Sequence, residues 1–348
     1  MELPTPTWSD IIKRAIEYRA SDILLAQNQV YFKRGSESVA VQYKLTPDWF
    51  EHLGSEVTSC NLLVDKDFTY EGRAGASDFS WSHSDRRFRV NKFKTNSGTS
   101  FAIRPLSPSI PTMEMVGFSK EVIQTLETKR QGLIIVTGPT GSGKSTALAA
   151  MIEYLNARHP LNIISIEDPI EYLYTSKRSV VQQREVGRDV GDFSTAVRSA
   201  MRESPDVILV GEIRDYHTLK ACLQAAETGH LVFATLHTKG VASTLMRMLD
   251  MAPANERSEV SAMLASSYQM VIYQKLIFFN GQYLTIREVL LPHAGVRNCL
   301  RTGTTAEVNN IIQMSQTQGM ISWDGDIKRH LAAGHITEEI AKSLKDQI

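Results

Sequence analysis

The sequence contains few cysteines and no excess of charge of either sign. The 348-residue chain has three cysteines, Cys60, Cys222 and Cys299, which lie far apart and include no CxxC pair. An odd number of separated cysteines argues against a disulfide framework, and the absence of CxxC pairs excludes a zinc ribbon. Lysine plus arginine total 38 and aspartate plus glutamate total 38, so the charge does not indicate a nucleic-acid or anionic-membrane partner.

The sequence also lacks the hydrophobic segments that direct a protein to a membrane or anchor it there. Its first ten residues, MELPTPTWSD, have neither the basic start nor the apolar core of a signal peptide. No apolar run approaches the roughly 18 residues that span a bilayer. Because the scattered cysteines suit a reducing compartment, we expect a soluble cytoplasmic protein.

Length and local patterns predict two domains, because 348 residues are many for one hydrophobic core. The first hundred residues are typical of a small α+β unit, with a helix that has Ser9 as a possible N-cap and a hairpin that turns at Asn96–Gly98. Pro105, Pro108 and Pro111 then exclude both a helix and a central strand. The expected parts are an N-terminal domain over residues 1–106, a linker over 107–117 and a second domain over 118–348.

From about Phe118 onward, short apolar runs alternate with helical stretches. The runs are GLIIVTG, NIISIED, DVILVGE and HLVFATLH, and they are apolar on both faces. Strands of this kind are typical of a mostly parallel sheet that is covered by helices. After PANERSEV we expect a mostly helical tail with one strand at QYLTIREVLL. The predicted fold class is therefore α/β.

The strongest motif is GPTGSGKST, which fits the pattern G-x-x-x-x-G-K-[ST] between an apolar strand and a helical stretch. Glycines let successive backbone amides point at phosphate oxygens, and the helix N-terminus adds a favourable field. Lys144 is expected to reach the β and γ phosphates of ATP, and Ser145 to ligate Mg²⁺. The candidate nucleotide-binding residues are Gly138, Thr140, Gly141, Ser142, Gly143, Lys144, Ser145 and Thr146.

A second motif, PDVILVGEIRD, places Glu212 at the end of a buried strand. A carboxylate beside a phosphate loop can orient or deprotonate the attacking water, or hold Mg²⁺ through water. P-loop ATPases commonly have a carboxylate immediately before this glutamate, but Gly211 occupies that position here. Glu212 is therefore a candidate both as general base and as metal ligand. The alternative is an ordinary solvated loop residue.

A third motif, NIISIEDPIEY, ends another apolar strand with Glu167, Asp168 and Glu171. Three carboxylates within five residues repel one another unless a cation or arginines balance their charge. We therefore consider Glu167 and Glu171 as catalytic candidates and Asp168 as a Mg²⁺ ligand. An ordinary acidic turn is the alternative.

The fourth motif, TGHLVFATLHT, has a histidine on each side of an apolar run. Val232, Phe233 and Thr235 favour a strand, and a separation of seven residues sends His230 and His237 to opposite sides of it. Neither histidine has another cysteine or histidine at ligand spacing, which argues against a metal site. Polar residues that merely close a buried strand are the simplest interpretation.

With these four motifs in order, the chain resembles the secretion ATPase superfamily, which includes the PilT-like, VirB11-like and GspE-like proteins. Within it, the chain is most similar to the PilT-like motors of twitching motility. The family's motifs are a Walker A loop, an Asp box, an atypical Walker B that ends in Gly-Glu, and a His box. They correspond here to GPTGSGKST, IEDPIEY, DVILVGEIRD and TGHLVFATLHT.

The resemblance implies a hexameric ring whose subunits have a PAS-like N-terminal domain and a RecA-like ATPase domain. It implies that ATP and Mg²⁺ bind between these domains and against the next subunit, and that His230 and His237 are polar sensors whose strand ends both face the site. Arginines of RRFRVN and FAIRPL match positions from which the family's N-terminal domain contacts phosphate. The candidates are Arg87, Arg89 and Arg104.

The direction of work is indicated by a C-terminal segment. Retraction motors carry a motif of the form A-I-R-N-L-I-R-E, and GVRNCLRT keeps Arg297, Asn298 and Arg301 of it. Assembly and secretion motors usually carry a longer N-terminal region and a tetracysteine zinc insert, which this sequence lacks. The resemblance thus implies a pilus retraction ATPase at the cytoplasmic face of the inner membrane, with a membrane platform protein as its partner.

Two alternatives remain open. The first is a related motor for pilus assembly, type II or type IV secretion, or conjugation, because these motors share the four motifs. The second is a RecA-like nucleic-acid translocase. The zero net charge and the absence of a basic, aromatic-rich stripe disfavour the translocase, so no nucleic acid is expected as a partner.

Overall fold

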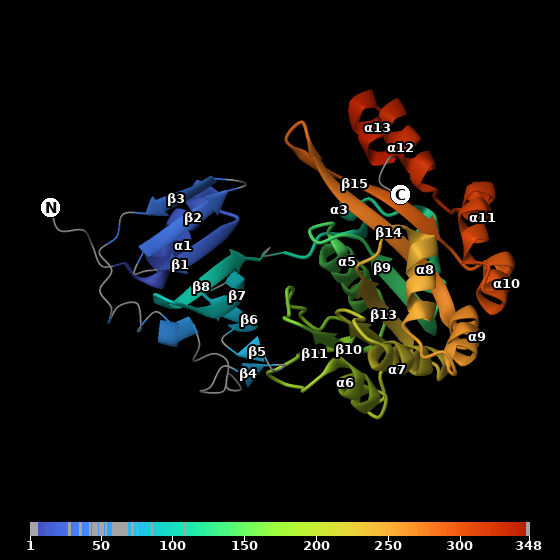
Figure 1. Cartoon of the computed structure of the whole chain (residues 1–348), viewed down its shortest axis with the longest axis horizontal. Coiled ribbons are helices and arrows are strands. Elements are labelled where there is room, and N and C mark those ends of the chain that lie inside the picture. Colours follow the sequence, from blue (N-terminus) through green and yellow to red (C-terminus); the bar gives the residue numbers. More distant parts are fainter. Residues whose placement is uncertain are drawn as a thin grey trace. The chain divides into compact units, whose positions relative to one another are not determined.

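The structure is a computed structural model, and Figure 1 traces its chain from blue to red. It describes residues 6–26, 29–34, 37–41, 43, 48, 52, 54–57, 69–70, 73–74, 76–84, 86–106 and 109–345. Cys60 and residues 107–108 of the expected linker lie outside these ranges. The mixed α/β class predicted from the sequence is confirmed by the helices and sheets described below.

The chain divides into two compact units that are not simply consecutive. The first unit comprises Met1–Ser109, Asp168–Leu173 and Arg184–Gly191. The second unit comprises Ile110–Glu167, Tyr174–Gln183 and Asp192–Ile348. Two short segments from the middle of the sequence therefore belong to the same compact unit as the N-terminal residues.

The first unit is built on a six-stranded sheet with the order β3-β2-β1-β8-β7-β6, in which the neighbouring pairs are antiparallel. Its strands are β1 (Asp22–Ala26), β2 (Gln29–Arg34), β3 (Glu37–Val41), β6 (Ala76–His83), β7 (Arg86–Thr95) and β8 (Gly98–Pro105). A separate pair consists of β4 (Thr69–Tyr70) and β5 (Arg73–Ala74). The hairpin predicted around Asn96–Gly98 is confirmed as β7 and β8, which pair from Thr95 and Gly98 onward.

Helix α1 (Trp8–Tyr18) begins two residues earlier than the sequence suggests. Its N-cap is Thr7 and not Ser9, because the Thr7 hydroxyl accepts from the Asp10 N–H while the Asp10 carboxylate accepts from the Thr7 N–H at 2.9 Å. This capping box satisfies two backbone donors, which Ser9 alone could not do. The buried face of α1 joins the core of the first unit, where the Trp8 and Trp81 rings lie 4.8 Å apart.

The second unit is built on a seven-stranded sheet with the order β11-β10-β12-β13-β9-β14-β15. The strands are β9 (Gly132–Thr137), β10 (Asn162–Glu167), β11 (Val180–Glu185), β12 (Val207–Val210), β13 (Leu231–Leu236), β14 (Tyr268–Phe279) and β15 (Gln282–Leu290). The pairs β10/β12, β12/β13, β13/β9 and β9/β14 are parallel, whereas β14 and β15 are antiparallel. Every residue of β9, β12 and β13 is buried, as their continuous apolar runs predict.

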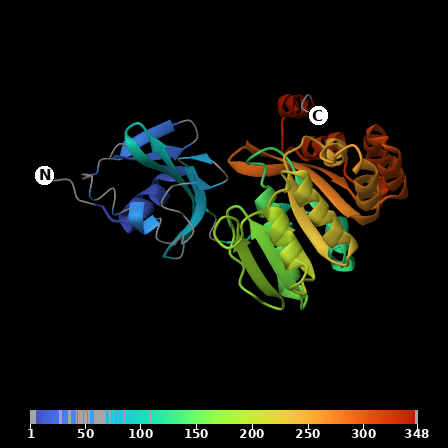
Figure 2. The ribbon, with the colours of Figure 1, turned by 60° about the horizontal axis from the view of Figure 1, so that its bottom comes forward.

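Helices accompany these strands throughout the second unit. They are α3 (Met113–Val116), α4 (Lys120–Thr128), α5 (Lys144–Arg158), α6 (Phe193–Ala200), α7 (Tyr216–Glu227), α8 (Val241–Asp250), α9 (Arg257–Ser267), α10 (Ala294–Thr302), α11 (Val308–Met314), α12 (Trp323–Ala332) and α13 (Glu338–Lys345). The C-terminal helices, orange to red in Figure 2, gather on the side of the unit where β14 and β15 lie. Within the described ranges, no helix combines the length and the apolar character needed to cross a membrane.

The C-terminal part of the chain is less helical than the sequence analysis predicted. The strand expected at QYLTIREVLL is confirmed as β15, but its partner β14 was missed and replaces part of the expected helical tail. Strand β14 pairs with β9 on one side and with β15 on the other, so it extends the sheet beyond the parallel core. Its residues YQMVIYQKLIFF form an apolar run without clear alternation, which a buried helix could also show.

Candidate active site

The predicted phosphate loop connects β9 to α5 at the edge of the sheet where the parallel strands end. Gly138 has a φ of 148°, and a Cβ built on it would lie 2.2 Å from the backbone oxygen of Gln274, so a side chain cannot fit there. Gly143 is the N-cap of α5 with a φ of 82°, and no side chain caps the helix. The N-terminal end of the α5 dipole therefore lies at the loop, where it favours an anionic ligand.

Lys144 begins α5, and its ammonium group folds back into the loop. The residue is 9% exposed, and Nζ donates to the carbonyl oxygens of Gly138 at 2.9 Å and Pro139 at 3.1 Å. Ser142 is buried, whereas Thr140 and Ser145 are exposed and Thr146 is half-buried. The Lys144 ammonium group thus contacts neutral carbonyl groups of its own loop, and phosphate oxygens could replace them.

Glu212 lies two residues beyond β12, at the same edge of the sheet. Its Oε2 accepts a hydrogen bond from Arg214 Nε at 2.9 Å, and its Oε1 lies 3.5 Å from His237 Nε2. His237 directly follows β13, and its Nδ1 lies 3.4 Å from Lys144 Nζ. The imidazole therefore bridges the loop lysine and the Glu212 carboxylate, and this network favours the tautomer with the proton on Nε2.

His237 lies in an environment that disfavours its protonated form. Partial burial has the largest effect, and the nearby Lys144 ammonium lowers the pKa of His237 further, below its ordinary value of 6.5. The Glu212 carboxylate opposes this effect without reversing it. His237 is therefore neutral at pH 7, with a lone pair on Nδ1 that can accept from Lys144.

We expect ATP turnover to fall as the pH drops through the lowered pKa of His237. Protonation removes the lone pair that faces Lys144 and adds a positive charge beside it, so the decline should begin below pH 6.5. The measurement compares the pH–kcat profiles of the parent and of His237→Gln, whose side chain does not titrate. The same acid limb in both proteins would show that another group causes it.

His230 lies at the opposite end of β13 from His237. Its Nδ1 lies 2.9 Å from the carbonyl oxygen of Ala225, in the last turn of α7. The six residues of β13 lie between the two histidines, so seven steps of about 3.3 Å place them roughly 23 Å apart. The expectation that both ends of this strand face one site is therefore wrong within a single chain, because a strand carries its two ends to opposite edges of the sheet.

The three predicted carboxylates of the Asp box are divided between the two units. Glu167 ends β10 in the second unit, where its Oε1 accepts from Ser165 Oγ at 2.8 Å and from Gln183 Nε2 at 3.3 Å. Asp168 and Glu171 belong to the first unit. There the Glu171 Oε1 lies 3.6 Å from Arg89 Nη1, so an arginine balances part of the acidic charge.

The three candidate arginines of the first unit each have a carboxylate partner. Arg87 Nη2 lies 3.4 Å from Glu185 Oε2, and Arg87 Nε donates to the Ile170 carbonyl at 2.9 Å. Arg89 pairs with Asp78 as well as with Glu171. Arg104, which is largely exposed, donates to Asp22 Oδ1 at 2.9 Å. Phosphate binding by any of them would have to compete with these carboxylates.

Sequence reasoning missed three residues that contact the predicted site residues: Glu185, Gln274 and Arg214. Glu185 is only 2% exposed, and it also accepts from the backbone N–H groups of Ser80 at 3.1 Å and Ile170 at 3.2 Å. Gln274 Nε2 donates to the Ser142 carbonyl of the phosphate loop at 2.7 Å. Arg214 was visible in the motif GEIRD, whereas the other two had no local signal because their partners are distant in sequence.

Comparison with known proteins gives concordant relatives by sequence and by structure. The profile of the family described as type II/IV secretion system protein matches residues 6–318. The type IV pilus retraction ATPase PilT of Pseudomonas aeruginosa is 46% identical over 257 residues, which cover 74% of this chain and 74% of the relative. A twitching motility protein of Neisseria gonorrhoeae is 42% identical over 269 residues, which cover 76% and 71%. The crystal structure of the pilus retraction motor PilT with bound ADP matches with a TM-score of 0.85 and 36% identity over 97% of each chain.

Proposed function

The chain belongs to the family of type II/IV secretion system proteins, and from this premise we propose that it is an ATP-driven motor that retracts type IV pili. The observation that carries the proposal is the group formed by Lys144, His237 and Glu212 beside the phosphate loop. A cation for phosphate and a carboxylate for water, joined by one imidazole, form a site suited to ATP hydrolysis.

In the proposed reaction, the N–H groups of the loop and of the first turn of α5 hold the phosphates of ATP. Lys144 exchanges its carbonyl partners for β and γ phosphate oxygens, where its charge stabilises the transition state. Glu212, oriented by Arg214 and His237, accepts a proton from the attacking water. Glu167 is the second candidate for this role, since it ends the strand next to β12.

The residues at this edge fit a magnesium ion. Mg²⁺ prefers oxygen ligands, usually takes few of them from the protein, and is held largely by substrate phosphates and water. The exposed Ser145 hydroxyl and the Glu212 carboxylate supply such oxygens at this edge, and Asp168 of the first unit is proposed as a third ligand. Among the described residues, no group of three or more His, Cys, Asp or Glu side chains could hold a metal without a nucleotide. The bound ion would neutralise charge on the transferred phosphoryl group.

The proposed motor is a homo-hexamer whose subunits combine a PAS-like domain over residues 1–106 with a RecA-like ATPase domain over 118–348. The parallel strands of the second unit and the antiparallel sheet of the first support this assignment. Arg87, Arg89 and Arg104 would act on nucleotide from the N-terminal domain, whereas Glu171, which lies outside residues 1–106, would be a catalytic residue of the Asp box. His230 would act at the site of a neighbouring copy, because it lies at the end of β13 far from Lys144 of its own chain.

The proposed partner is a platform protein of the inner membrane, against whose cytoplasmic side the ring would work. The segment GVRNCLRT is the candidate contact, and it lies entirely within α10. Asn298, Arg301 and Thr302 are exposed, and Arg301 and Thr302 follow Asn298 by three and four residues, so each lies beside Asn298 on the helix surface. Arg297 is different, because it donates to the Ser266 carbonyl at 2.7 Å and to the Ala265 carbonyl, at the end of α9.

We expect substitutions of the neighbouring residues Arg297 and Asn298 to have different effects. Asn298→Ala should leave ATPase activity and stability unchanged but abolish fibre shortening, because its side chain is exposed in the part of the chain that the structure describes. Arg297→Ala should lower the free energy of unfolding by about 1–3 kcal/mol, since it leaves the last carbonyls of α9 without a donor. Thermal unfolding, ATPase assays and imaging of fibres measure the three effects. Equal loss of ATPase activity and retraction in Asn298→Ala would contradict the assignment.

Deletion of the gene in its own host tests the proposed function. A retraction motor predicts more surface fibres, counted by electron microscopy, which no longer shorten. The parent gene should restore shortening, whereas a gene encoding Glu212→Gln at the same protein level should not. Loss of fibres would indicate an assembly motor instead, and unchanged fibres would indicate secretion or conjugation.

A further inference from the structure

Strand β14 supports the phosphate loop from one side through Gln274. This residue is 1% exposed, and its side-chain amide donates to the Ser142 carbonyl at 2.7 Å. Its own backbone oxygen is the atom that leaves no space for a side chain at Gly138. The loop therefore rests on Gln274 at both its first glycine and its fifth residue, so a movement of one should displace the other.

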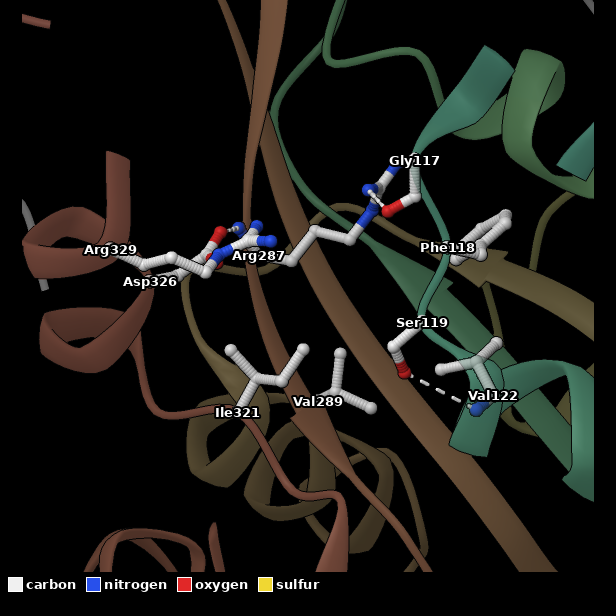
Figure 3. Close-up of a pocket in the computed structure, with 9 residues that line it drawn as sticks. All are labelled: Gly117, Phe118, Ser119, Val122, Arg287, Val289, Ile321, Asp326 and Arg329. Atoms are coloured by element: carbon white, nitrogen blue, oxygen red, sulfur yellow. Dashed lines mark hydrogen bonds and ion pairs between the residues drawn. The ribbon is translucent and has the colours of Figure 1, made fainter. Parts of the chain in front are cut away.

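Gln274 is linked in turn to a buried arginine on the neighbouring strand. Arg287 lies directly opposite Gln274 in the β14/β15 register, and its Nε donates to Gln274 Oε1 at 3.4 Å. Its other nitrogens donate to the carbonyl oxygens of Gly117 at 3.0 Å and Val116 at 2.7 Å. Figure 3 shows the guanidinium group reaching toward Gly117 and Phe118, and it lies 4.5 Å from the centre of the Phe118 ring.

These contacts connect the phosphate loop to the start of the second unit. Val116 and Gly117 end the short helix α3, which follows Ile110, the first residue of that unit. Arg287 is only 5% exposed, and burial lowers its pKa to about 10, so it remains charged at pH 7. A charged group costs free energy to bury and is retained only where several partners satisfy it. Here the acceptors are neutral and come from two otherwise separate elements.

The loop itself carries a sign of strain in its present conformation. The Ser142 hydroxyl is buried without a hydrogen-bond partner among the described residues. An unsatisfied buried polar group costs about 1–3 kcal/mol. A bound phosphate would draw Lys144 away from the Gly138 and Pro139 carbonyls and so rearrange the loop around Ser142. Gln274 would transmit this rearrangement, since it holds the Ser142 carbonyl.

We propose that Gln274 and Arg287 are positioning residues that couple nucleotide binding at the phosphate loop to the segment Val116–Phe118. The proposal rests on the proposed function only in requiring that the loop binds a nucleotide. Gln274 positions the phosphate loop, and Arg287 links the conformation of Gln274 to residues 116 and 117 near the beginning of the second unit. Because the coupling passes through two side chains, either one can be removed without touching the nucleotide.

Hydrogen exchange of residues 112–119, measured with and without ADP, tests the coupling. In the parent we expect ADP to slow exchange in this segment at least about threefold, since binding commonly restricts an ordered network. Arg287→Met should bind ADP nearly as well as the parent but lose this slowing. Gln274→Met should lose the slowing and also bind ADP about tenfold more weakly. Gln282→Met, at an exposed position of β15, is the matched control and should behave like the parent.

The outcomes separate this proposal from the proposed function. If Arg287→Met and Gln274→Met slow exchange on ADP binding as the parent does, or if the parent shows no slowing, the coupling is refuted. If the coupling is seen but the deletion strain retracts its fibres normally, only the proposed function falls. A parent that does not bind ADP refutes both. Should Arg287→Met fail to fold, Arg287→Lys serves instead, because a single ammonium group cannot reach Gln274 and both carbonyls together.

Discussion

ATP turnover by Glu212→Gln is expected to fall about 10³-fold, while nucleotide binding stays close to that of the parent. The amide keeps the shape of the side chain and can still contact Arg214 or His237, but it cannot take a proton from water. Single-turnover kinetics with a fluorescent ATP analogue separates binding from the chemical step.

Glu259→Gln is the matched control for this experiment. Glu259 is an exposed carboxylate on α9, and its nearest charged partner is Lys220 at 3.6 Å, outside the candidate site. We expect this variant to hydrolyse ATP at the parent rate. If Glu212→Gln also does so, Glu212 is not the general base, and the role passes to Glu167 or Glu171.

Lys144→Ala should abolish turnover by removing the cation that faces the phosphates. Truncation of one partner of a close charge pair commonly costs about 2–5 kcal/mol, so the Kd for ADP should rise about 30-fold to several thousand-fold. Titration with fluorescent ADP measures this change directly. Lys342→Ala, at an exposed position on α13, should leave the Kd unchanged.

A folding check accompanies this variant, because Lys144 also holds the empty loop together. Its ammonium group donates to two loop carbonyls that would lose their donor. A modest drop in thermal stability is therefore expected without nucleotide. Tight ADP binding by a folded Lys144→Ala protein would contradict the assignment of this loop as the phosphate site.

The sequence predicts the parts of this site that depend on local patterns. The phosphate-loop motif GPTGSGKST and the buried apolar runs before Lys144 and Glu212 are patterns of neighbouring residues. Parallel strands also end at the same edge of a sheet, so the chain direction alone brings these residues together. His237 follows the same rule. His230 lies at the other end of β13, so a motif that groups the two histidines by sequence does not place them side by side within one chain.

Other features depend on contacts that no local pattern records. Gln274 meets Ser142 across 132 positions of the chain, and Glu185 meets Ser80 across 105. Strand β14 was missed because continuous apolar residues suit a buried helix as well as a central strand. Thr7 replaced Ser9 as the cap of α1 because the reciprocal bond with Asp10 outweighs a single hydroxyl.

The interleaved composition of the two compact units limits how such a protein can change by recombination. An exchange of gene segments at residue 109 would carry Ser80 and Arg87 to a new protein but leave Glu185 and Ile170 behind. The recipient would then contain the half-buried Arg87 without its carboxylate, and the residues left behind would contain the buried Glu185 without these donors, which is strongly destabilising. Inheritance of the N-terminal residues is thus tied to that of residues 168–173 and 184–191, and the three stretches should evolve together.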